Sequence, residues 1–333
     1  MKALEYNLRL ASYAVAKEFP KNSGSDTIRF FRPRKAVTTY VDKITEGTTP
    51  TNLTEVAIGY VDCQAKQRGA LAKITDIVRA VDLFDTLQTY VKTMGADAAL
   101  DFDGICRNAI CANPAIAAHG LNSGATTMYN TDTSYERFAG VVNTGDSSND
   151  FATFHAQAAS AAKMTRLVHL GAITQLRQAN VPMINGKYPV ITPPQVLFDI
   201  RQDATWIAAA VYNPETLKLY KWAEFELDGG VFVEANNPYR EAATYGTHAA
   251  AGENFSVLYL GAEAFGVPKL SGVAGSDPRS PSMIILTQAD KADPLNQVVT
   301  AGWKAYYMAC LLKTNVSDDV PHCVVQRVKT TFA

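Results

Sequence analysis

The residues with the clearest chemical potential form a basic cluster near the N-terminus. Its cations are Arg29, Arg32, Arg34 and Lys35. Closely spaced positive groups could contact a polyanion such as nucleic acid. They could equally form salt bridges with an acidic neighbour, and we favour this second interpretation because the segment that follows in the chain is acidic.

The acidic counterpart is a long segment after residue 73 in which aspartates outnumber cations. The aspartates that we assign to its exposed face are Asp82, Asp85, Asp97 and Asp101. A basic arm followed by an acidic helix favours head-to-tail contacts between copies of the chain. Ordinary solvated faces would give the same pattern, so charge alone leaves both interpretations open.

Motifs that would define an enzyme are not found in the sequence. It contains no phosphate-binding loop, dinucleotide fingerprint, H-E-x-x-H or G-x-S-x-G, and its five histidines are scattered. Asp101 and Asp103 point apart on a helix, and Asp318 and Asp319 suit a turn, so neither pair is a good acid–base dyad. The residues therefore predict no catalytic group, no metal site and no cofactor.

Composition sets broad limits on the kind of protein. With 333 residues, 47% of them hydrophobic, the chain can bury a full core and could hold two domains. The net charge of −1 gives no overall attraction to nucleic acid or acidic membranes. Five cysteines without paired spacing indicate a reducing compartment. No apolar run approaches the roughly 20 residues that span a bilayer, so we expect no membrane partner.

The first half of the chain predicts a helical arm, an extended loop and a long helix. Residues 1–19 have the apolar spacing of a helix, and residues 28–73 alternate like a β-hairpin. A hairpin of this length would project about 50–65 Å. Because an isolated two-stranded hairpin is only marginally stable, it needs another surface to lie on. Its predicted turn comprises Thr45, Glu46, Gly47, Thr48, Thr49 and Pro50.

The long helix is predicted over residues 74–112 from apolar residues three and four apart. Its apolar face includes Ile74, Ile77, Val78, Val81, Phe84, Leu87, Val91, Met94, Ala98, Phe102, Ile105 and Ala109. At 1.5 Å per residue this helix would be roughly 55 Å long, which is unusual for a globular domain. We interpret it as a spine.

The second half of the chain predicts mixed helices and strands, which makes the fold class α+β. Helices are expected over residues 150–178, 194–201 and 214–221. Strands are expected over residues 188–191, 230–234, 255–260 and 283–287. Residues 299–311 alternate strictly and are expected to form a terminal antiparallel hairpin with residues 323–328.

The order of these features resembles the major capsid protein of tailed double-stranded-DNA bacteriophages, most closely the branch found in short-tailed phages with large genomes. The resemblance covers nearly the whole chain and depends on collinear motifs. These are the basic arm, the loop with Glu46–Pro50, the spine helix, and the runs at residues 188–203, 261–266, 293–297 and 302–304.

The resemblance implies the Hong Kong 97-type capsid fold and its domain plan. The plan comprises an N-terminal arm at 1–27, an extended loop at 28–73, a peripheral domain at 74–189 with the spine helix at 74–112, an axial domain at 190–290, and terminal strands at 291–333 that return to the peripheral domain. The loop tip at residues 45–50, the basic cluster and the acidic helix face would then contact neighbouring subunits.

The resemblance also implies a function and partners. The chain would be a structural, non-enzymatic protein that assembles into hexamers and pentamers of an icosahedral shell around phage DNA. It would be located in the virion and assembled in the bacterial cytoplasm. Its partners would be other copies, a portal and a separate scaffolding protein, because no leading scaffolding segment is visible. A decoration protein is an optional partner, DNA would be contacted weakly, and no crosslinking Lys–Asn pair can be assigned.

Two other functions remain open from the residues alone. One is a soluble α/β enzyme with a helical cap and an active site between Pro193 and Ser276. The other is a nucleic-acid-binding module that acts through the basic N-terminal arm.

Overall fold

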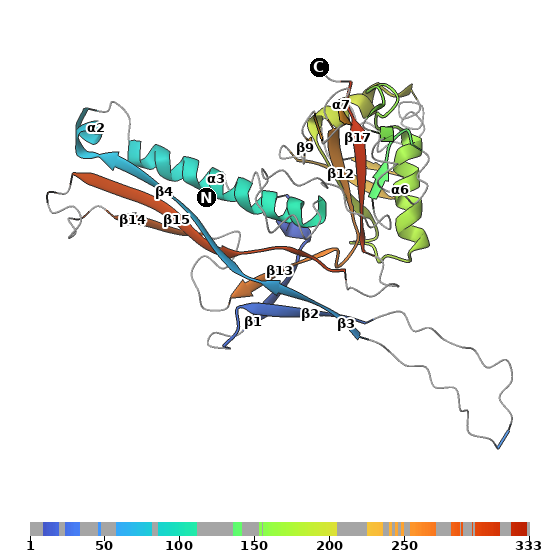
Figure 1. Cartoon of the computed structure of the whole chain (residues 1–333), viewed down its shortest axis with the longest axis horizontal. Coiled ribbons are helices and arrows are strands. Elements are labelled where there is room, and N and C mark those ends of the chain that lie inside the picture. Colours follow the sequence, from blue (N-terminus) through green and yellow to red (C-terminus); the bar gives the residue numbers. More distant parts are fainter. Residues whose placement is uncertain are drawn as a thin grey trace.

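The computed structural model shows an elongated molecule with three parts: a sheet domain, a long arm and a projecting ribbon (Figure 1). It describes residues 9–19, 24–33, 46–47, 58–81, 86–111, 136–141, 153–154, 156–204, 225–235, 240–241, 244–245, 248–249, 254–270, 281–286, 288, 295, 297–313 and 321–331.

The sheet domain is built on a seven-stranded mixed sheet in the order β5-β17-β12-β6-β8-β7, with β9 paired to β12. Its strands are β5 (Glu136–Phe138), β6 (Tyr188–Thr192), β7 (Phe225–Leu227), β8 (Gly230–Glu234), β9 (Arg240–Glu241), β12 (Asn254–Leu260) and β17 (Cys323–Lys329). Every residue of β6 and of β17 is buried. Such continuous burial is typical of central strands that are covered on both faces.

Two helices, α6 (Arg166–Gln178) and α7 (Pro194–Gln202), pack on this sheet. Both begin at clear N-terminal signals, because the hydroxyl of Thr165 accepts a hydrogen bond from the backbone of Val168 and Pro194 occupies the first helical position of α7. The helix predicted over residues 150–178 is therefore too long at its N-terminus. Turns and a bridge between Lys163 and Lys329 occupy the residues before Thr165.

The long arm consists of the helix α3 (Thr86–Cys111) packed on a three-stranded antiparallel sheet in the order β14-β15-β4. The strands are β4 (Lys66–Thr75), β14 (Ser282–Leu286) and β15 (Val298–Tyr307). Alternate residues of β15 are buried, as the sequence predicted, and its aromatic side chains contact the helix. The ring of Phe102 lies 5.6 Å from that of Trp303 and 4.9 Å from that of Tyr307.

The spine helix differs from its predicted bounds of 74–112. Ile74 and Thr75 end β4, a short helix α2 covers Asp76–Val81, and α3 begins only at Thr86. The side chain of Asp76 accepts a hydrogen bond from the backbone of Ile77 at the point where the strand becomes a helix. The apolar spacing misplaced the boundary because Ile74 is buried as a strand residue rather than as a helix residue.

A third sheet receives the N-terminal arm, in the order β1-β13-β16. A 3-10 helix, η1 (Ala11–Tyr13), leads into β1 (Val15–Phe19), which runs parallel to β13 (Phe265–Leu270), and β16 (Cys310–Leu311) pairs on the other side. The predicted N-terminal helix is therefore wrong for residues 15–19, it is reduced to one 3-10 turn at residues 11–13, and residues 1–8 lie outside the described part. Backbone pairing with β13 overrides a weak helical pattern, since short helices are marginal without strong packing. A separate two-stranded pair joins β10 (Thr244–Tyr245) to β11 (His248–Ala249).

The projecting ribbon is an antiparallel pair of β2 (Thr27–Pro33) and β3 (Ile58–Gln64). It confirms the predicted hairpin at its base, while Val37, Val41 and Val56 lie outside the described residues. The predicted loop of 28–73 is divided, however, because β4 follows after Ala65 alone and pairs with β15 over ten residues. Strand alternation identifies a strand but does not identify its partner.

The prediction for the C-terminus is wrong for the same reason, since strand alternation does not identify the partner strand. The predicted terminal hairpin is wrong, because β15 pairs with β4 and β14 while β17 pairs with β12 and β5. The last strand thus joins the sheet of the proposed axial domain and does not return to the arm. α6, which was expected in the peripheral domain, packs on the same sheet. The domain bounds that the resemblance implies, including 74–189 and 291–333, stay a prediction.

One buried cation connects the arm to the sheet domain. Arg327 of β17 is 1% exposed and donates from Nη2 to the carbonyl of Cys111, the last residue of α3, at 3.0 Å. Its Nη1 donates to the hydroxyl of Ser256 in β12. A cation at the C-terminus of a helix satisfies a free carbonyl and complements the helix dipole.

Replacing Phe102 by alanine tests the packing of the arm. Phe102 is fully buried between Trp303 and Tyr307, so Phe102→Ala should lower the free energy of unfolding by about 3–5 kcal/mol. Urea denaturation followed by circular dichroism measures the change. The control is Leu100→Ala on the same helix, where the side chain is 43% exposed and the expected loss is below about 1 kcal/mol. Equal losses for both variants would contradict the described packing.

Candidate interaction surfaces

The buried histidine of the sheet domain has structural partners. His169 lies between the hydroxyl of Tyr259 at 3.0 Å and the carbonyl of Leu227 at 3.1 Å, and burial lowers its pKa to about 4. Among the described residues, no group of three or more His, Cys, Asp or Glu could hold a metal ion. No helix among these residues has both the length and the apolarity to cross a membrane.

The basic cluster lies at the base of the ribbon and makes contacts within its own chain. Arg29 forms a two-pronged salt bridge with Asp62 on the neighbouring strand, at 2.7 and 2.9 Å, and its guanidinium lies 3.9 Å from the ring centre of Tyr60. This pairing raises the pKa of Arg29 and lowers that of Asp62. Arg32 donates to the carbonyl of Leu312. The other two predicted members, Arg34 and Lys35, lie outside the described residues.

The acidic face of α3 also makes an ion pair within its own chain. Both carboxylate oxygens of Asp101 accept hydrogen bonds from Arg68 of β4 at 2.7 Å, which ties α3 to its sheet. Asp97 is exposed, and Asp82 and Asp85 lie outside the described part. Among the described members of the two clusters, Arg29 pairs with Asp62 of the ribbon and Asp101 pairs with Arg68 of β4, so neither of these ion pairs joins the basic cluster to the acidic one. Whether they meet between copies stays a prediction.

The structure describes two residues of the predicted loop tip. Glu46 and Gly47 form an exposed turn, and Gly47 has a φ of 79°, a conformation that favours glycine. The other members, Thr45, Thr48, Thr49 and Pro50, lie outside the described residues. The turn agrees with the predicted reversal of the chain at this point.

A surface that the sequence did not predict lies at the distal end of the arm, around α2 (Figure 1). We call it the tip patch, and it comprises Ile77 (71% exposed), Val78 (48%), Val81 (80%), Leu286 (60%) and Leu295 (75%). Pairing of Thr75 with Val298 and of Leu286 with Thr300 brings these segments to the same end. The sequence assigned the three α2 residues to a buried helix face, which is wrong. Clustered exposed apolar side chains of this kind mark interaction sites.

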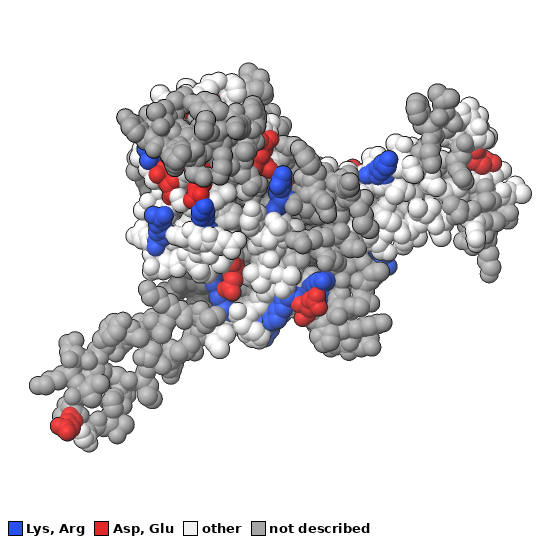
Figure 2. Space-filling model, turned by 180° about the vertical axis from the view of Figure 1, so that it is seen from behind, with Lys and Arg blue, Asp and Glu red and all other residues white. Residues whose placement is uncertain are grey.

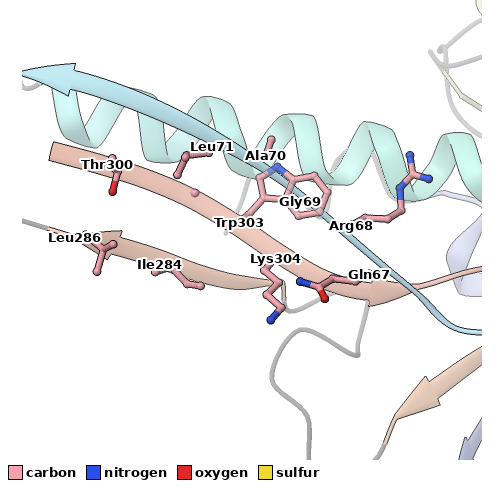
Figure 3. Close-up of a pocket in the computed structure, with 11 residues that line it drawn as sticks. Gln67, Arg68, Gly69, Ala70, Leu71, Ile284, Leu286, Thr300, Trp303 and Lys304 are labelled. Carbon is pink, nitrogen blue, oxygen red and sulfur yellow. The ribbon is translucent and has the colours of Figure 1, made fainter. Parts of the chain in front are cut away.

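A second unpredicted surface is a trough on the face of the β14-β15-β4 sheet that α3 does not cover (Figure 3). Its volume is about 630 Å³. Gly69 and Gly302 form its floor, and a Cβ on Gly302 would lie 2.9 Å from the carbonyl oxygen of Ala70. The lining residues are Gln67, Arg68, Gly69, Ala70, Leu71, Ile284, Leu286, Thr300, Gly302, Trp303 and Lys304. The trough is therefore mostly apolar and has no acidic lining residue; Lys304 places a charge at its edge, whereas the guanidinium of Arg68 is paired with Asp101 on the α3 side of the sheet.

A third surface is the outward face of the ribbon base. Phe31 is 65% exposed and Tyr60 is 53% exposed, and the two residues face each other across the strand pair. The ammonium of Lys17 lies 5.1 Å from the ring centre of Phe31. On the face of the molecule seen in Figure 2, the described basic and acidic side chains are interspersed rather than gathered by sign.

Comparison with known proteins identifies the fold. No family model matches the chain, and no curated protein matches it. Solved structures do match over nearly its whole length. The capsid of Ralstonia phage GP4 aligns with a TM-score of 0.66 at 16% identity, covering 97% of this chain and 89% of that one. The Cyanophage Pam1 capsid aligns with a TM-score of 0.67 at 13% identity, covering 99% and 93%.

A further match is the capsid of Helicobacter pylori bacteriophage KHP30, with a TM-score of 0.63 at 9% identity, covering 94% of this chain and 87% of that one. At these identities the likeness establishes the fold. The chain has the α+β fold of bacteriophage capsid proteins. The Hong Kong 97-type fold that the resemblance implied is confirmed.

Substitutions in the tip patch should separate folding from association. Ile77→Ser with Val81→Ser changes side chains that are 71% and 80% exposed, so the urea midpoint should stay within the error of the wild type. Self-association measured by sedimentation velocity should weaken at least tenfold. The matched control is Leu167→Ser on α6, also 80% exposed but outside the patch, and it should leave both measurements unchanged. Unaltered association in the double variant would exclude the tip patch as a contact.

Proposed function

We propose that this chain is a structural major capsid protein. Its copies assemble into hexamers and pentamers of an icosahedral shell that encloses phage DNA in the virion. The observation that carries the proposal is the near full-length likeness to phage capsid structures. The exposed apolar side chains at the extremities of the molecule support it, because they have no evident use in an isolated monomer.

The distribution of the surfaces suits a closed shell. A shell of identical chains needs heterologous contacts, in which different patches of neighbouring copies meet. The tip patch, the trough and the ribbon base belong to different elements and would allow one copy to contact several neighbours. The charges at the ribbon base and on α3 that are already paired within the chain would keep the subunit rigid while apolar surfaces make the contacts.

The extended loop would lie across a neighbouring copy, with residues 45–50 as its tip. Our proposed seat is the trough, because its lining is mostly apolar, includes no acidic residue and has the ammonium of Lys304 at its edge. The distal part of the loop, residues 42–55, carries Asp42, Glu46 and Glu55 against Lys43 alone, and this acidic excess would complement the ammonium of Lys304. Gly69 and Gly302 would let an extended backbone approach the sheet closely.

The partners follow from the same proposal. Besides other copies, the shell would require a portal and a separate scaffolding protein during assembly in the host cytoplasm, with a decoration protein as an optional addition. The packaged DNA would be bound weakly. The net charge is −1, and the face seen in Figure 2 has basic and acidic side chains interspersed, which does not favour strong binding of phosphates.

Two other functions find less support. A nucleic-acid-binding module would need available cations, whereas Arg29 pairs with Asp62 and Arg32 contacts a backbone carbonyl. An enzyme with its active site between Pro193 and Ser276 would need convergent acid–base groups. In the described part of that range, the carboxylate of buried Asp199 accepts hydrogen bonds from the backbone and hydroxyl of Thr331.

Purification of the full chain tests the proposal directly. We expect hexameric or pentameric rings, or shells of megadalton mass, by mass photometry and electron microscopy. A monomer or dimer at all concentrations, with or without scaffolding protein, would contradict it. DNA affinity that depends on salt and is lost when residues 1–20 are deleted would favour the nucleic-acid-binding module.

Substitutions at the loop tip test its role separately. Replacing Glu46 and Gly47 by alanine and proline, respectively, should reduce the yield of rings or shells while the urea midpoint of the monomer stays unchanged, because both residues are exposed. The control is Asp97→Ala, an exposed residue of α3 outside the loop. Unfolding of the monomer by the loop substitutions would show that the loop is misplaced.

A further inference from the structure

Two free cysteines from distant parts of the sequence lie together where the ribbon meets the β1-β13-β16 sheet. Cys63 of β3 is 3% exposed, and Cys310 of β16 packs against the small hydrophobic cluster that contains Cys63. The two thiols are hydrogen-bonded to each other. The thiol of Cys310 also donates a hydrogen bond to the carbonyl of Gly266 of β13 at 3.6 Å. Thiols placed in this way can form an S–S bond with little movement of the backbone.

The joint around this thiol pair is held by contacts that do not involve sulfur. The ring of Phe30 lies directly over Gly266, where a Cβ would come within 2.8 Å of the ring. Arg32 of the ribbon donates a hydrogen bond to the carbonyl of Leu312, just after β16, and Leu312 is buried in the same cluster as Cys63. These contacts fix the ribbon base against β13 and β16. The two thiols therefore meet in the folded chain without any rearrangement.

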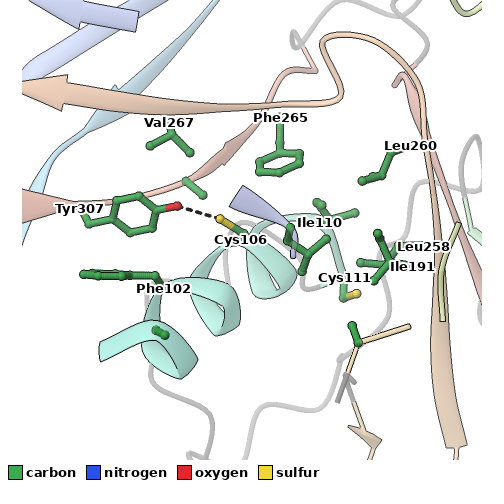
Figure 4. Close-up of a cluster of buried hydrophobic side chains, with 14 of the residues drawn as sticks. Phe102, Cys106, Ile110, Cys111, Ile191, Leu258, Leu260, Phe265, Val267 and Tyr307 are labelled. Carbon is green, nitrogen blue, oxygen red and sulfur yellow. Dashed lines mark hydrogen bonds between the residues drawn. The ribbon is translucent and has the colours of Figure 1, made fainter. Parts of the chain in front are cut away.

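The other three cysteines are in a different environment. Cys106, Cys111 and Cys323 are each at most 2% exposed and belong to the core that α3 covers. Figure 4 shows the first two on α3, with the thiol of Cys106 hydrogen-bonded to the hydroxyl of Tyr307 at 2.9 Å. Burial raises the pKa of Cys106 and that of Cys323 to about 12, so their thiolates are scarce. Cys310, in contrast, is partly exposed to solvent.

We propose that Cys63 and Cys310 form an oxidation site, at which a small-molecule disulfide such as oxidised glutathione joins them by an intramolecular disulfide. The thiolate of Cys310 first attacks the S–S bond of oxidised glutathione, which gives a mixed disulfide and releases one glutathione thiolate. The thiolate of Cys63 then attacks the sulfur of Cys310 and releases the second glutathione. The two cysteines lose two electrons, oxidised glutathione gains them, and the two thiol protons pass to the two glutathiones.

The environment of the site sets its rate and its effect. The hydrogen bond with Cys63, together with burial, raises the pKa of Cys310. The first step should therefore be slow at neutral pH and should accelerate as the pH rises, because the thiolate is the attacking species. The product would tie β3 covalently to β16 and hold the ribbon base against its sheet. The site belongs to the folded monomer and does not rest on the proposed function.

Peptide mapping of the oxidised full chain tests the site. The folded protein is incubated with oxidised glutathione near pH 8.5, where an ordinary thiol is about half ionised, then alkylated in denaturant and digested with trypsin without reduction. We expect the peptides 44–66 and 305–313 to be joined by a disulfide in most molecules. The remaining three cysteines should be recovered as alkylated thiols, because their burial protects them from the oxidant.

Two serine variants separate the two steps. In Cys63→Ser the thiol of Cys310 should carry one glutathionyl group that is not released, because no second thiol attacks it. In Cys310→Ser the thiol of Cys63 should stay reduced, because it is buried and has lost its partner. Hydrogen–deuterium exchange of residues 27–33 and 58–64 should slow at least threefold when the wild type is oxidised and recover on reduction. The same treatment should leave exchange in Cys310→Ser unchanged.

Three results from the wild type would overturn the site, and they apply even if a serine variant fails to fold. The first is that both cysteines stay reduced, and the second is that Cys310 carries glutathione without a link to Cys63. The third is that the other cysteines are crosslinked as often, which would assign the reaction to unfolded chains. Light scattering on the reduced protein reports assembly separately. Failure of assembly in a protein that forms the crosslink would count against the proposed function and leave the oxidation site intact.

Discussion

The architecture depends on the contact between the buried guanidinium of Arg327 and the last carbonyl of α3. Hydrophobic residues of the arm and of one face of the seven-stranded sheet form a single core, in which α3 ends against β17 and β12, while α6 and α7 cover a second core on the other face of that sheet. A charge is costly to bury unless its donors are satisfied, so the positions of Cys111 and Ser256 are tightly constrained by Arg327. Because the guanidinium is planar and its donors are fixed in direction, it sets the angle between helix and sheet as well as their distance.

Charged and apolar side chains on the surface have different roles. Charged residues at the ribbon base and beneath α3 are paired inside the chain, in Arg29–Asp62 and Arg68–Asp101. Exposed apolar residues remain at the tip patch and along the trough. A subunit arranged in this way keeps its shape mainly through its hydrophobic cores, satisfies its surface charges within the chain, and meets other molecules through surfaces that gain stability only when they are covered.

The sequence predicted the elements better than their partners. The bounds of β8 and α7 and the alternation of β15 followed from apolar patterning and helix-start signals, which are local properties. Partners could not be predicted, because β4, β12, β15 and β17 pair over separations that no local pattern encodes. The tip patch was missed for a related reason. Ile77 and Val81 have the spacing of a buried face, and only the distal position of α2 leaves them exposed.

The direct passage from β3 to β4 has a mechanical consequence. Only Ala65 separates the ribbon from a ten-residue antiparallel ladder with β15, so the two form one nearly continuous extended run. The hydrogen bonds of such a ladder lie perpendicular to the strands. Tension applied along the ribbon would therefore load the ladder in shear, with many bonds sharing the force, instead of unzipping them one after another. Outward pressure on an assembly of such chains would be carried by backbone that is already aligned to resist it.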